Sequence, residues 1–456
     1  MVFSKCTLKF SSKASNTIYL TPSLRKQLRI ASRNVTLRFG QKSVSVQVRG
    51  LRRTGSQLIV PLSIKNALYI PTGGSCSIEA NRGEIQLGPI IGIMTGITKD
   101  PNRPFGNRTD YIKQLLNMGG KKAYTYAFSP RSIDWNQGTV VGYFLNPSGG
   151  FVRRKVSLPN VIYNRLPSRS AEKSPELNHL KERLVRKRIP LFNWSFFDKW
   201  DVYHMLEGTS EYKKYVPESA IDPSPDKIKQ MLEKHQFLYL KPTSGSLGIG
   251  IYRITYSPKK GYYVRYRKNG KNVLLRIQSF PDLMRMLGHR RGRLSKYVAQ
   301  QGIRLIEIDR CPIDFRFHMV KNGQGNWVVA AIGAKKAGRG SVTTHLRTGG
   351  HLMTPLQALN QVYSPEQSRR ILEQAKEASV RLAESIEQNY HHMLGELGFD
   401  IGIDQRGNIW MFEANAKPGR SIFKHPALKD SGRSTISQLI DYCVYLSPFA
   451  SGRGDR

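Results

Sequence analysis

The amino-acid sequence predicts a protein of mixed α/β and α+β class with several domains. At 456 residues, the chain is longer than a single hydrophobic core usually serves. Hydrophobic residues make up 39% and aromatic residues 10% of it, which is enough to fill real cores and excludes a disordered chain. Patterns of strands and helices alternate along most of the length, and this predicts the mixed class. The expected domains are residues 1–88, 89–190, 191–300 and 301–447, followed by a flexible tail at 448–456.

The first 88 residues are expected to form a small β-rich domain. Apolar and polar residues alternate in NVTLRF (34–39), SVSVQV (43–48) and QLIVPL (57–62), a pattern typical of short antiparallel strands. The same region has 14 Lys and Arg against two Glu. This excess of positive charge indicates either a docking surface or only the solvated face of a basic protein.

The region from residue 89 to about residue 190 is expected to be a parallel α/β unit. PIIGIMTG (89–96) has the composition of a buried strand that ends in a Gly turn, and TDYIKQLLNMGGK (109–121) that of a helix closed by Gly. KAYTYAFS (122–129) and VVGYFLN (140–146) are predicted strands. The order strand, helix, strand favours parallel pairing within one sheet.

The rest of the chain is expected to contain further strands and one long helix. FLYLK (237–241) and IGIYRI (249–254) are predicted strands on either side of the loop PTSGSLG (242–248), and Asn269-Gly270 predicts a hairpin turn. Residues 365–396 have no internal proline and carry apolar residues near helical spacing. They therefore predict a long amphipathic helix.

The charge balance of the whole chain is strongly basic. It contains 72 Lys and Arg against 32 Asp and Glu, which gives a formal net charge of +40. A field of that sign attracts polyanions such as nucleic acid, an anionic cell-wall polymer or an acidic protein, without selecting among them. The four cysteines are far apart and have no metal-ligand spacing, so neither a zinc site nor a disulfide framework is predicted.

No secretory or membrane-spanning segment is expected. The start, MVFSKCTLKF, lacks the apolar core of a signal peptide. The longest apolar stretch, PIIGIMTGI (89–97), is too short and too rich in Gly to cross a bilayer. These features predict a soluble protein that is made in a reducing cytoplasm.

The stretch KPTSGSLGIG (241–250) has the features of a phosphate-binding loop. Its three glycines and two serines allow backbone N–H groups to face an anion, and Lys241 adds a positive charge where the loop begins. The loop leads into a strand and not into a helix, which excludes both a P-loop and a Rossmann loop. It is expected to be a flap between antiparallel strands, and an ordinary hairpin is the alternative.

Two carboxylates and an amide form a second candidate site near the C-terminus. Asp400 lies 13 residues before Glu413, and Asp404 and Gly407 mark a turn between them. Two antiparallel strands joined at this turn bring Asp400 beside Glu413, with Asn415 just beyond. Their oxygens are hard ligands of the kind that Mg²⁺ prefers. The alternative is a surface hairpin with incidental acids.

Taken in order, these motifs resemble the ATP-grasp superfamily, which includes D-alanine:D-alanine ligase and glutathione synthetase. The resemblance rests on Lys199 in DKW, Lys241 before the Ser/Gly loop, the hinge-like YVAQQGI, Arg316 in DFR, and the pair FDIGID and WMFEANAKPG. The segments GIMTG, NVIYNRLPSR, KPTSGSLGIGI and FEANAKPG resemble most closely the endospore coat-associated YheC/YheD family. The resemblance covers roughly residues 88–446. It implies an ATP-grasp fold, with a preATP-grasp-like α/β domain and two α+β subdomains.

The resemblance also implies a set of binding and catalytic residues. Asp400, Glu413 and Asn415 match the ligands of Mg²⁺, and Arg316 and Lys241 match catalytic residues near the transferred phosphate. In SVTTHLRTGG the family usually has Asn at the position of His345. The residues implied to bind ATP are Lys199, Lys241, Ser244, Gly245, Ser246, Gly248, Gly250, His345 and the main chain of Gln301, Gly302 and Ile303.

The implied reaction joins a carboxylate to an amine or a thiol through an acyl phosphate, and the sequence identifies neither substrate. Arg165 in YNRLPSR is a candidate for binding the substrate carboxylate or, equally, an ordinary surface arginine. One alternative function is a structural spore-coat protein that keeps the ATP-grasp fold without turnover. Another is a basic protein that binds nucleic acid or a different polyanion. Spore-coat proteins and anionic polymers are accordingly expected partners, at the spore coat or envelope.

Overall fold

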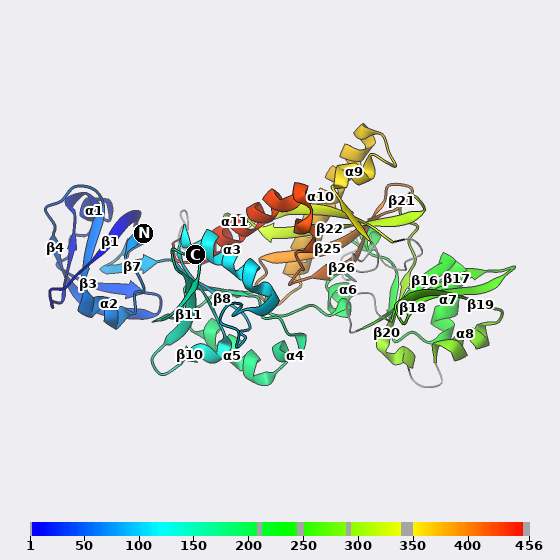
Figure 1. Cartoon of the computed structure of the whole chain (residues 1–456), viewed down its shortest axis with the longest axis horizontal. Coiled ribbons are helices and arrows are strands. Elements are labelled where there is room, and N and C mark those ends of the chain that lie inside the picture. Colours follow the sequence, from blue (N-terminus) through cyan, green and yellow to red (C-terminus); the bar gives the residue numbers. More distant parts are fainter. Residues whose placement is uncertain (1, 208–211, 244–249, 289–292, 339–349, 450–456) are drawn as a thin grey trace.

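The structure is a computed structural model that describes residues 2–207, 212–243, 250–288, 293–338 and 350–449. Its strands form one closed barrel and three open sheets. In Figure 1 the barrel lies at the left end of the molecule, an α/β sheet lies beside it, and the other two sheets follow toward the right. Within the described ranges, no helix has both the length and the apolar character needed to cross a membrane.

The N-terminal region forms the closed barrel, in the order β1-β5-β2-β4-β3-β7-β6. The prediction of antiparallel strands is wrong for three of its pairs, because β1 and β5, β2 and β4, and β3 and β7 run parallel. The alternation of side chains along a strand is the same in both orientations, so the sequence pattern could not distinguish them. The elements are β1 (Val2–Ser11), β2 (Thr17–Leu20), α1 (Pro22–Gln27), β3 (Asn34–Phe39), β4 (Lys42–Gly50), β5 (Gln57–Pro61), α2 (Leu62–Leu68), β6 (Gly74–Asn81) and β7 (Glu84–Gly88).

The second sheet is built around parallel strands, as the strand-helix-strand order predicts. Strands β9, β8, β13 and β14 are successive parallel neighbours, and β11 extends the edge as an antiparallel partner of β9. Asn164 pairs with Met94, so β13 and β8 end side by side and Arg165 follows at this end. The elements are β8 (Ile90–Met94), α3 (Thr109–Gly120), β9 (Tyr124–Phe128), β10 (Ile133–Asp134), β11 (Thr139–Leu145), β12 (Phe151–Ser157), β13 (Val161–Asn164), α4 (Arg169–Glu172), α5 (Pro175–Arg186) and β14 (Leu191–Phe192).

The third sheet has the order β15-β20-β16-β17-β18-β19. Strands β16 and β17 are antiparallel, as predicted for the two sides of the Ser/Gly loop, although β17 begins at Tyr252. The predicted hairpin is confirmed, because Asn269 (φ 47°) and Gly270 (φ 77°) both have left-handed backbone between β18 and β19. The elements are β15 (Ser219–Ile221), α7 (Pro225–His235), β16 (Phe237–Pro242), β17 (Tyr252–Ser257), β18 (Gly261–Lys268), β19 (Lys271–Ile277), α8 (Phe280–Leu287) and β20 (Tyr297–Gln301).

The fourth sheet has the order β24-β23-β22-β25-β26. Apolar side chains such as Phe315 and Phe399 pack on one of its faces against α10, and the alternation along each strand therefore places Arg316 and Asp400 on the opposite face. The elements are β21 (Glu307–Ile308), β22 (Cys311–Lys321), β23 (Trp327–Lys336), β24 (His351–Met353), α9 (Pro355–Leu359), α10 (Pro365–Gln388), β25 (Glu396–Ile403), β26 (Ile409–Asn415) and α11 (Lys429–Leu446).

The long helix predicted over residues 365–396 is real but shorter. Helix α10 begins with a capping box between Ser364 and Gln367 and ends at Gln388. The prediction is wrong at its C-terminal end, where Glu396 already belongs to β25. Every second residue from Leu397 onward is buried in the core, which is the period of a strand. Pairing with β22 therefore overrides the apolar pattern that favoured a longer helix.

The α/β sheet and the fourth sheet share one hydrophobic core. It contains Ile93 of β8, Val161 of β13, Val320 of β22 and Leu439 of α11. Helix α11 packs against α3 on one side and against β22 and β23 on the other. Beside this shared core, Tyr163 of β13 and the following Arg165 contact Glu396 of β25.

Candidate functional site

Three of the predicted site residues form one row across the fourth sheet. Arg316 stands opposite Asp400 in the pairing of β22 with β25, and Asp400 stands opposite Glu413 in the pairing of β25 with β26. The prediction that Asp400 and Glu413 lie side by side is thus confirmed. Asn415 lies on the same face two residues later, opposite Gly398.

Two cations surround the carboxylate of Asp400. Arg316 donates from Nε to Oδ1 and from Nη2 to Oδ2, each over 2.9 Å, and Lys335 Nζ lies 3.0 Å from Oδ1. Burial raises the pKa of Asp400, but the charges of Arg316 and Lys335 outweigh it and hold the pKa well below its usual range. Lys335 also lies 2.9 Å from Asp314. Asp400 is therefore ionised at neutral pH.

Lys335 was not among the residues predicted for the site. It comes from β23, and it reaches Asp400 across β22 because Asp314 and Lys335 are opposite each other in that pair. No motif in its own segment marks it, since its role depends entirely on the pairing of strands.

The donor chemistry of Asp400, Glu413 and Asn415 fits a hard divalent cation. The set offers an ionised carboxylate, a second carboxylate directly opposite it and an amide oxygen on the same face. In the described part of the chain, no group of three or more His, Cys, Asp and Glu is arranged to hold a metal ion. A Mg²⁺ ion bound here would therefore need the amide and oxygens brought by a ligand.

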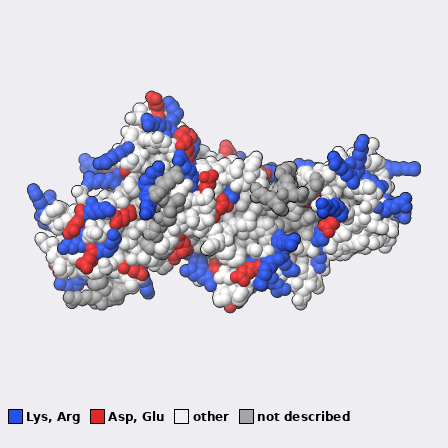
Figure 2. Space-filling view, turned by 180° about the vertical axis from the view of Figure 1, so that it is seen from behind, with Lys and Arg blue, Asp and Glu red and all other residues white. Residues whose placement is uncertain are grey.

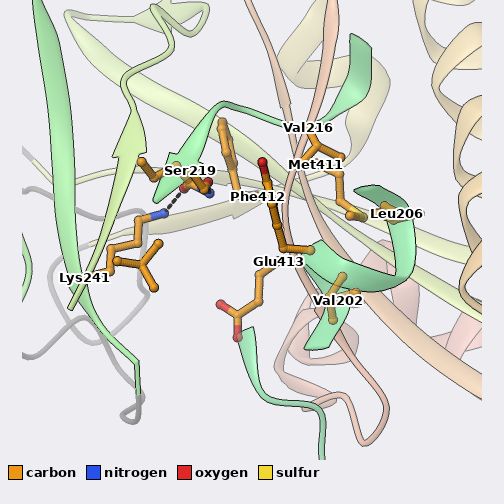
Figure 3. A pocket seen from close by; sticks show the side chains of 12 residues that line it. Val202, Leu206, Val216, Ser219, Lys241, Met411, Phe412 and Glu413 are labelled. Carbon is orange, nitrogen blue, oxygen red and sulfur yellow. Dashed lines mark hydrogen bonds between the residues drawn. The ribbon is translucent and has the colours of Figure 1, made fainter. Parts of the chain in front are cut away.

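A pocket lies between the third and fourth sheets, beside α6 (Lys199–Glu207) (Figure 3). Lys241 and Glu413 line it from opposite sides, so the lysine predicted to bind phosphate and the carboxylate predicted to bind metal face a common space. Its apolar wall was not predicted. The lining residues are Val202, Tyr203, Leu206, Val216, Ser219, Lys241, Val298, Gln300, Met411, Phe412, Glu413 and Ala414.

Lys241 lies near the end of β16 with its ammonium group directed toward the pocket. Nζ donates a hydrogen bond to Gln300 Oε1 and lies 5.7 Å from the ring centroid of Phe412. Phe412 immediately precedes Glu413 in the chain. The third sheet therefore contributes the positive charge of the pocket, and the fourth sheet contributes the negative charge.

The predicted hinge, Gln301 to Ile303, follows directly on the pocket residue Gln300. The N–H groups of Gln301 and Gly302 donate to the main-chain carbonyls of Glu218 (2.8 Å) and Phe237 (3.0 Å). A Cβ atom on Gly302 would lie 2.1 Å from the ring of Phe237. Only glycine fits at this point, and the hinge is consequently held close against β16.

Several predicted nucleotide residues cannot be placed in this site. Ser244, Gly245, Ser246, Gly248 and His345 lie outside the described residues. Lys199 is the first residue of α6, and its side chain is likewise not described. Gly250 is described: it has a left-handed φ of 78°, and a Cβ atom there would lie 3.0 Å from Pro242.

Arg165 lies apart from this pocket, and its interpretation as a surface arginine is wrong. It is only 6% exposed, because it lies between the end of β13 and the fourth sheet. Nη1 donates to Glu396 Oε2 over 3.0 Å, and Nη2 donates to the carbonyl of Pro418 over 3.3 Å. Its proposed contact with a substrate remains a prediction.

The two sheets that enclose the pocket, with the lysine on one and the paired carboxylates on the other, define the chain as an ATP-grasp protein. The family model described as "YheC/D like ATP-grasp" matches residues 188–446. The chain belongs to this family.

Two relatives from Bacillus subtilis (strain 168) are similar over long stretches. The endospore coat-associated protein YheD is 33% identical over 440 residues, which is 95% of this chain and 94% of the relative. The endospore coat-associated protein YheC is 23% identical over 277 residues, which is 58% of this chain and 72% of the relative.

Solved structures of ligases are similar at lower identity. D-alanyl-alanine synthetase A from Vibrio cholerae has 13% identity and a TM-score of 0.46, over 78% of this chain and 98% of its own. A RiPP-associated ATP-grasp ligase from Chryseobacterium gregarium, in complex with ADP and a leader and core peptide, has 11% identity and a TM-score of 0.43, over 79% of this chain and 97% of its own.

Proposed function

We propose that the protein is a Mg-ATP-dependent ligase that joins a carboxylate to an amine or a thiol through an acyl phosphate. The observation that carries this proposal is the position of Lys241 and Glu413 in one pocket, with Asp400 and Arg316 continuing the row from Glu413. A metal-bound triphosphate requires positive charge beside its phosphates and oxygen ligands for its metal ion. The positive group and the pair of carboxylates on the facing sheets supply both.

The nucleotide is assigned to the pocket between the third and fourth sheets. The adenine ring packs against the apolar wall formed by Val202, Leu206 and Met411. The main chain of Gln301 to Ile303, which directly follows the lining residue Gln300, is proposed to border the ring. Lys241 binds the phosphates from the third sheet, together with Lys199 and the loop at residues 244–250. His345, where the family usually has Asn, is proposed as a further phosphate ligand.

Asp400, Glu413 and Asn415 are the residues proposed to hold Mg²⁺. When bound, the metal ion neutralises phosphate charge and orients the transferred phosphoryl group. Arg316 and Lys335 hold the carboxylate of Asp400 in a fixed orientation on the sheet face. Arg316 is also proposed to face the transferred phosphate and the acyl phosphate.

The proposed reaction has two steps. An oxygen of the substrate carboxylate attacks the γ-phosphorus of ATP, and ADP leaves. The amine or thiol then attacks the acyl carbon, inorganic phosphate leaves, and the nucleophile loses its proton. The side chains of the protein take little part in the covalent steps, so positioning and charge neutralisation account for the catalysis.

A trapping assay tests the proposal without knowledge of the nucleophile. The protein is incubated with Mg-ATP, hydroxylamine and mixtures of amino acids, acidic peptides and cell-wall precursors, and ADP and hydroxamate are measured. A ligase releases both in equal amounts, because hydroxylamine attacks the acyl phosphate. ATP binding without any release of ADP would favour the alternative of a non-catalytic coat protein. The Asp400→Asn protein is the inactive control.

The relatives support a location at the spore. Both are named endospore coat-associated proteins, and we propose that this chain is likewise made in the cytoplasm and acts at the spore coat or envelope. Spore-coat proteins are then its proposed partners. Localisation of a fluorescent fusion during sporulation tests this.

The barrel favours a second activity, which is binding of an anionic polymer. Glu79 is 7% exposed and Glu84 is bonded to Arg38, so the two acids of this region do not balance its 14 basic residues. Figure 2 shows Lys and Arg spread over the barrel at the right of that view. Binding of a polyanion here should weaken steeply with salt, and binding that is insensitive to salt would exclude it.

A further inference from the structure

Three arginines meet where the α/β sheet contacts the fourth sheet. Arg165 follows β13, Arg108 immediately precedes α3, and Arg420 follows β26. The guanidinium carbons of Arg165 and Arg420 lie 5.3 Å and 4.7 Å from the ring centroid of Tyr111. Arg108 donates from Nη1 to the main-chain carbonyl of Arg165 over 3.2 Å. We call Arg108, Arg165 and Arg420 the arginine cluster.

Glu396 is the one carboxylate in contact with the arginine cluster among the described residues. Oε2 accepts from Arg165 over 3.0 Å and from the hydroxyl of Tyr163, and Oε1 accepts from His318 Nε2 over 2.8 Å. Burial raises its pKa, but Arg165, His318 and Arg420 outweigh burial and lower the pKa to about 2. Glu396 is thus ionised, and its oxygens are already occupied.

The other titratable groups of the cluster bring no negative charge at neutral pH. Burial lowers the pKa of His318, which keeps the ring neutral, and burial raises the pKa of both Tyr111 and Tyr163. Three guanidinium groups therefore face one carboxylate. Burial, and next the charge of Arg165, lower the pKa of Arg108.

Two buried polar atoms of the cluster have no hydrogen-bond partner in the described part of the chain. Arg420 Nη1 is one of them, and it lies 3.8 Å from Glu396 Oε1, beyond hydrogen-bond range. His318 Nδ1 is the other, but it is an acceptor, because Nε2 of the neutral ring donates to Glu396, and it therefore gives no argument for an anion. A buried donor normally finds an acceptor, so the unpartnered Arg420 Nη1 indicates a missing acceptor such as an oxygen of an anionic ligand.

The surroundings also favour an anion. Helix α3 begins at Thr109, directly after Arg108, and has no side-chain cap, so the positive end of its dipole lies next to Arg108. Arg165 lies at the carboxyl ends of β8 and β13, which is where α/β sheets commonly bind ligands. Arg108, Tyr111 and Arg420 are partly exposed and form the accessible side of the cluster.

The cluster and the metal site lie on the same strand. Glu396 and Asp400 are four residues apart on one face of β25, which corresponds to roughly 13 Å. A Cβ atom on Gly398, midway between them, would lie 3.3 Å from Arg316 Nη1. The guanidinium group of Arg316 therefore lies over the strand between the two sites.

We propose that the arginine cluster binds a second anionic group of the acid substrate, while the reacting carboxylate lies near Arg316. The substrate is then an extended acid with at least two carboxylates and not a monocarboxylic amino acid. Because Arg316 reaches from Asp400 to Gly398, the two carboxylates are expected to be roughly 7 to 13 Å apart. Arg108 and Arg420 bind the distal carboxylate, and Arg165 stays paired with Glu396. This inference rests on the proposed ligase function, because it names the substrate of that site.

Two peptides of equal length serve as probes. Tetraglutamate and tetraglutamine both have a free α-carboxylate and span a comparable distance, but only the first has side-chain carboxylates. Calorimetry in the presence of Mg-ADP should show tetraglutamate binding about tenfold or more tightly than tetraglutamine, since each charged hydrogen bond contributes substantially. Equal affinities, or no binding of either peptide, would overturn the proposal.

The matched variants are Arg108→Gln and Arg420→Gln, with Arg131→Gln as the control. Arg131 is exposed on the same domain, so its variant lowers the net charge equally. The two cluster variants should each lose about tenfold in tetraglutamate affinity and leave tetraglutamine affinity unchanged. Arg108 is partly exposed, so its variant should fold even if Arg420→Gln does not. Losses equal to that of Arg131→Gln would show only general attraction to a basic protein.

The same proteins separate failure of this inference from failure of the ligase proposal. Peptide binding needs no turnover. Selective binding of tetraglutamate without release of ADP in the Mg-ATP assay would support the arginine cluster as a binding site and contradict the ligase proposal. If monocarboxylic acids cause release of ADP as readily as tetraglutamate does, the ligase proposal is supported. The proposal that the arginine cluster selects the substrate is then contradicted.

Discussion

Asp400 lies directly opposite Glu413 on the neighbouring antiparallel strand, and the register of the two strands shifts immediately afterwards, between Asp400 and Ile401. Such an irregularity turns side chains locally and is common beside functional sites. Here the irregularity follows the pair of Asp400 and Glu413, whose carboxylates both lie on the pocket side of the sheet. The two acids are therefore held as a pair by the backbone pairing of β25 and β26.

The first prediction concerns Glu413→Gln. The substitution keeps the shape of the side chain and removes one negative charge, so the fold should persist while Mg²⁺ loses a ligand. Mg-dependent formation of ADP should fall by roughly two orders of magnitude or more. Steady-state ADP release at saturating ATP measures this, and Glu384→Gln, an exposed acid on α10, is the control. Normal turnover in the Glu413→Gln protein would remove this residue from the metal site.

The second prediction concerns Lys241→Ala. Loss of the ammonium group leaves phosphate charge unneutralised in a partly apolar pocket, so the affinity for ATP should fall by about tenfold or more. Calorimetric titration with Mg-ATP measures the change. Lys229→Ala, on the exposed side of α7, should bind as the unmodified protein does. Equal affinity in both variants would mean that the loop after Lys241 is an ordinary hairpin.

The third prediction concerns Gly302→Ala. The added Cβ atom would lie 2.1 Å from the ring of Phe237, so the hinge must shift or the ring must move. Overpacking of this kind should cost about 1–3 kcal/mol in the free energy of unfolding and should also weaken ATP binding. Gly120→Ala is the control, because nothing lies within 4 Å of a Cβ atom there. Thermal unfolding that is alike in the two variants would contradict the close contact.

The fourth prediction concerns acid stability and Glu396. The folded pKa of this group is about 2, against an ordinary value of 4.5. Between these values the unfolded chain binds the proton more readily, so the stabilisation is complete above the higher pKa and is lost as the pH falls through the lower one. Melting temperatures of the unmodified protein should therefore decline over this interval.

The Glu396→Gln protein provides the comparison. Its side chain cannot titrate, so its melting temperature should decline less over the same acidic interval. At neutral pH it should melt at a lower temperature than the unmodified protein, because Arg165 loses its buried partner. An identical decline in both proteins would assign the acid sensitivity to other carboxylates.

The sequence by itself determined the features that depend on neighbouring residues. The strands on either side of the Ser/Gly loop, the Asn269-Gly270 turn and the pairing of Asp400 with Glu413 were all predicted and confirmed. The turn and the carboxylate pair depend on a short connection, because such a connection between antiparallel strands leaves little freedom in the register.

Only the tertiary structure decided the features that join distant segments. Arg165 meets Glu396 across 231 residues, and Arg316 meets Asp400 across 84. The parallel pairs of the barrel, the early end of α10 and the position of Lys335 beside Asp400 belong to the same group. A local pattern reports which face of an element is apolar, but it does not report which element will cover that face. The burial and charge partners of these residues therefore follow from the assembly of whole sheets.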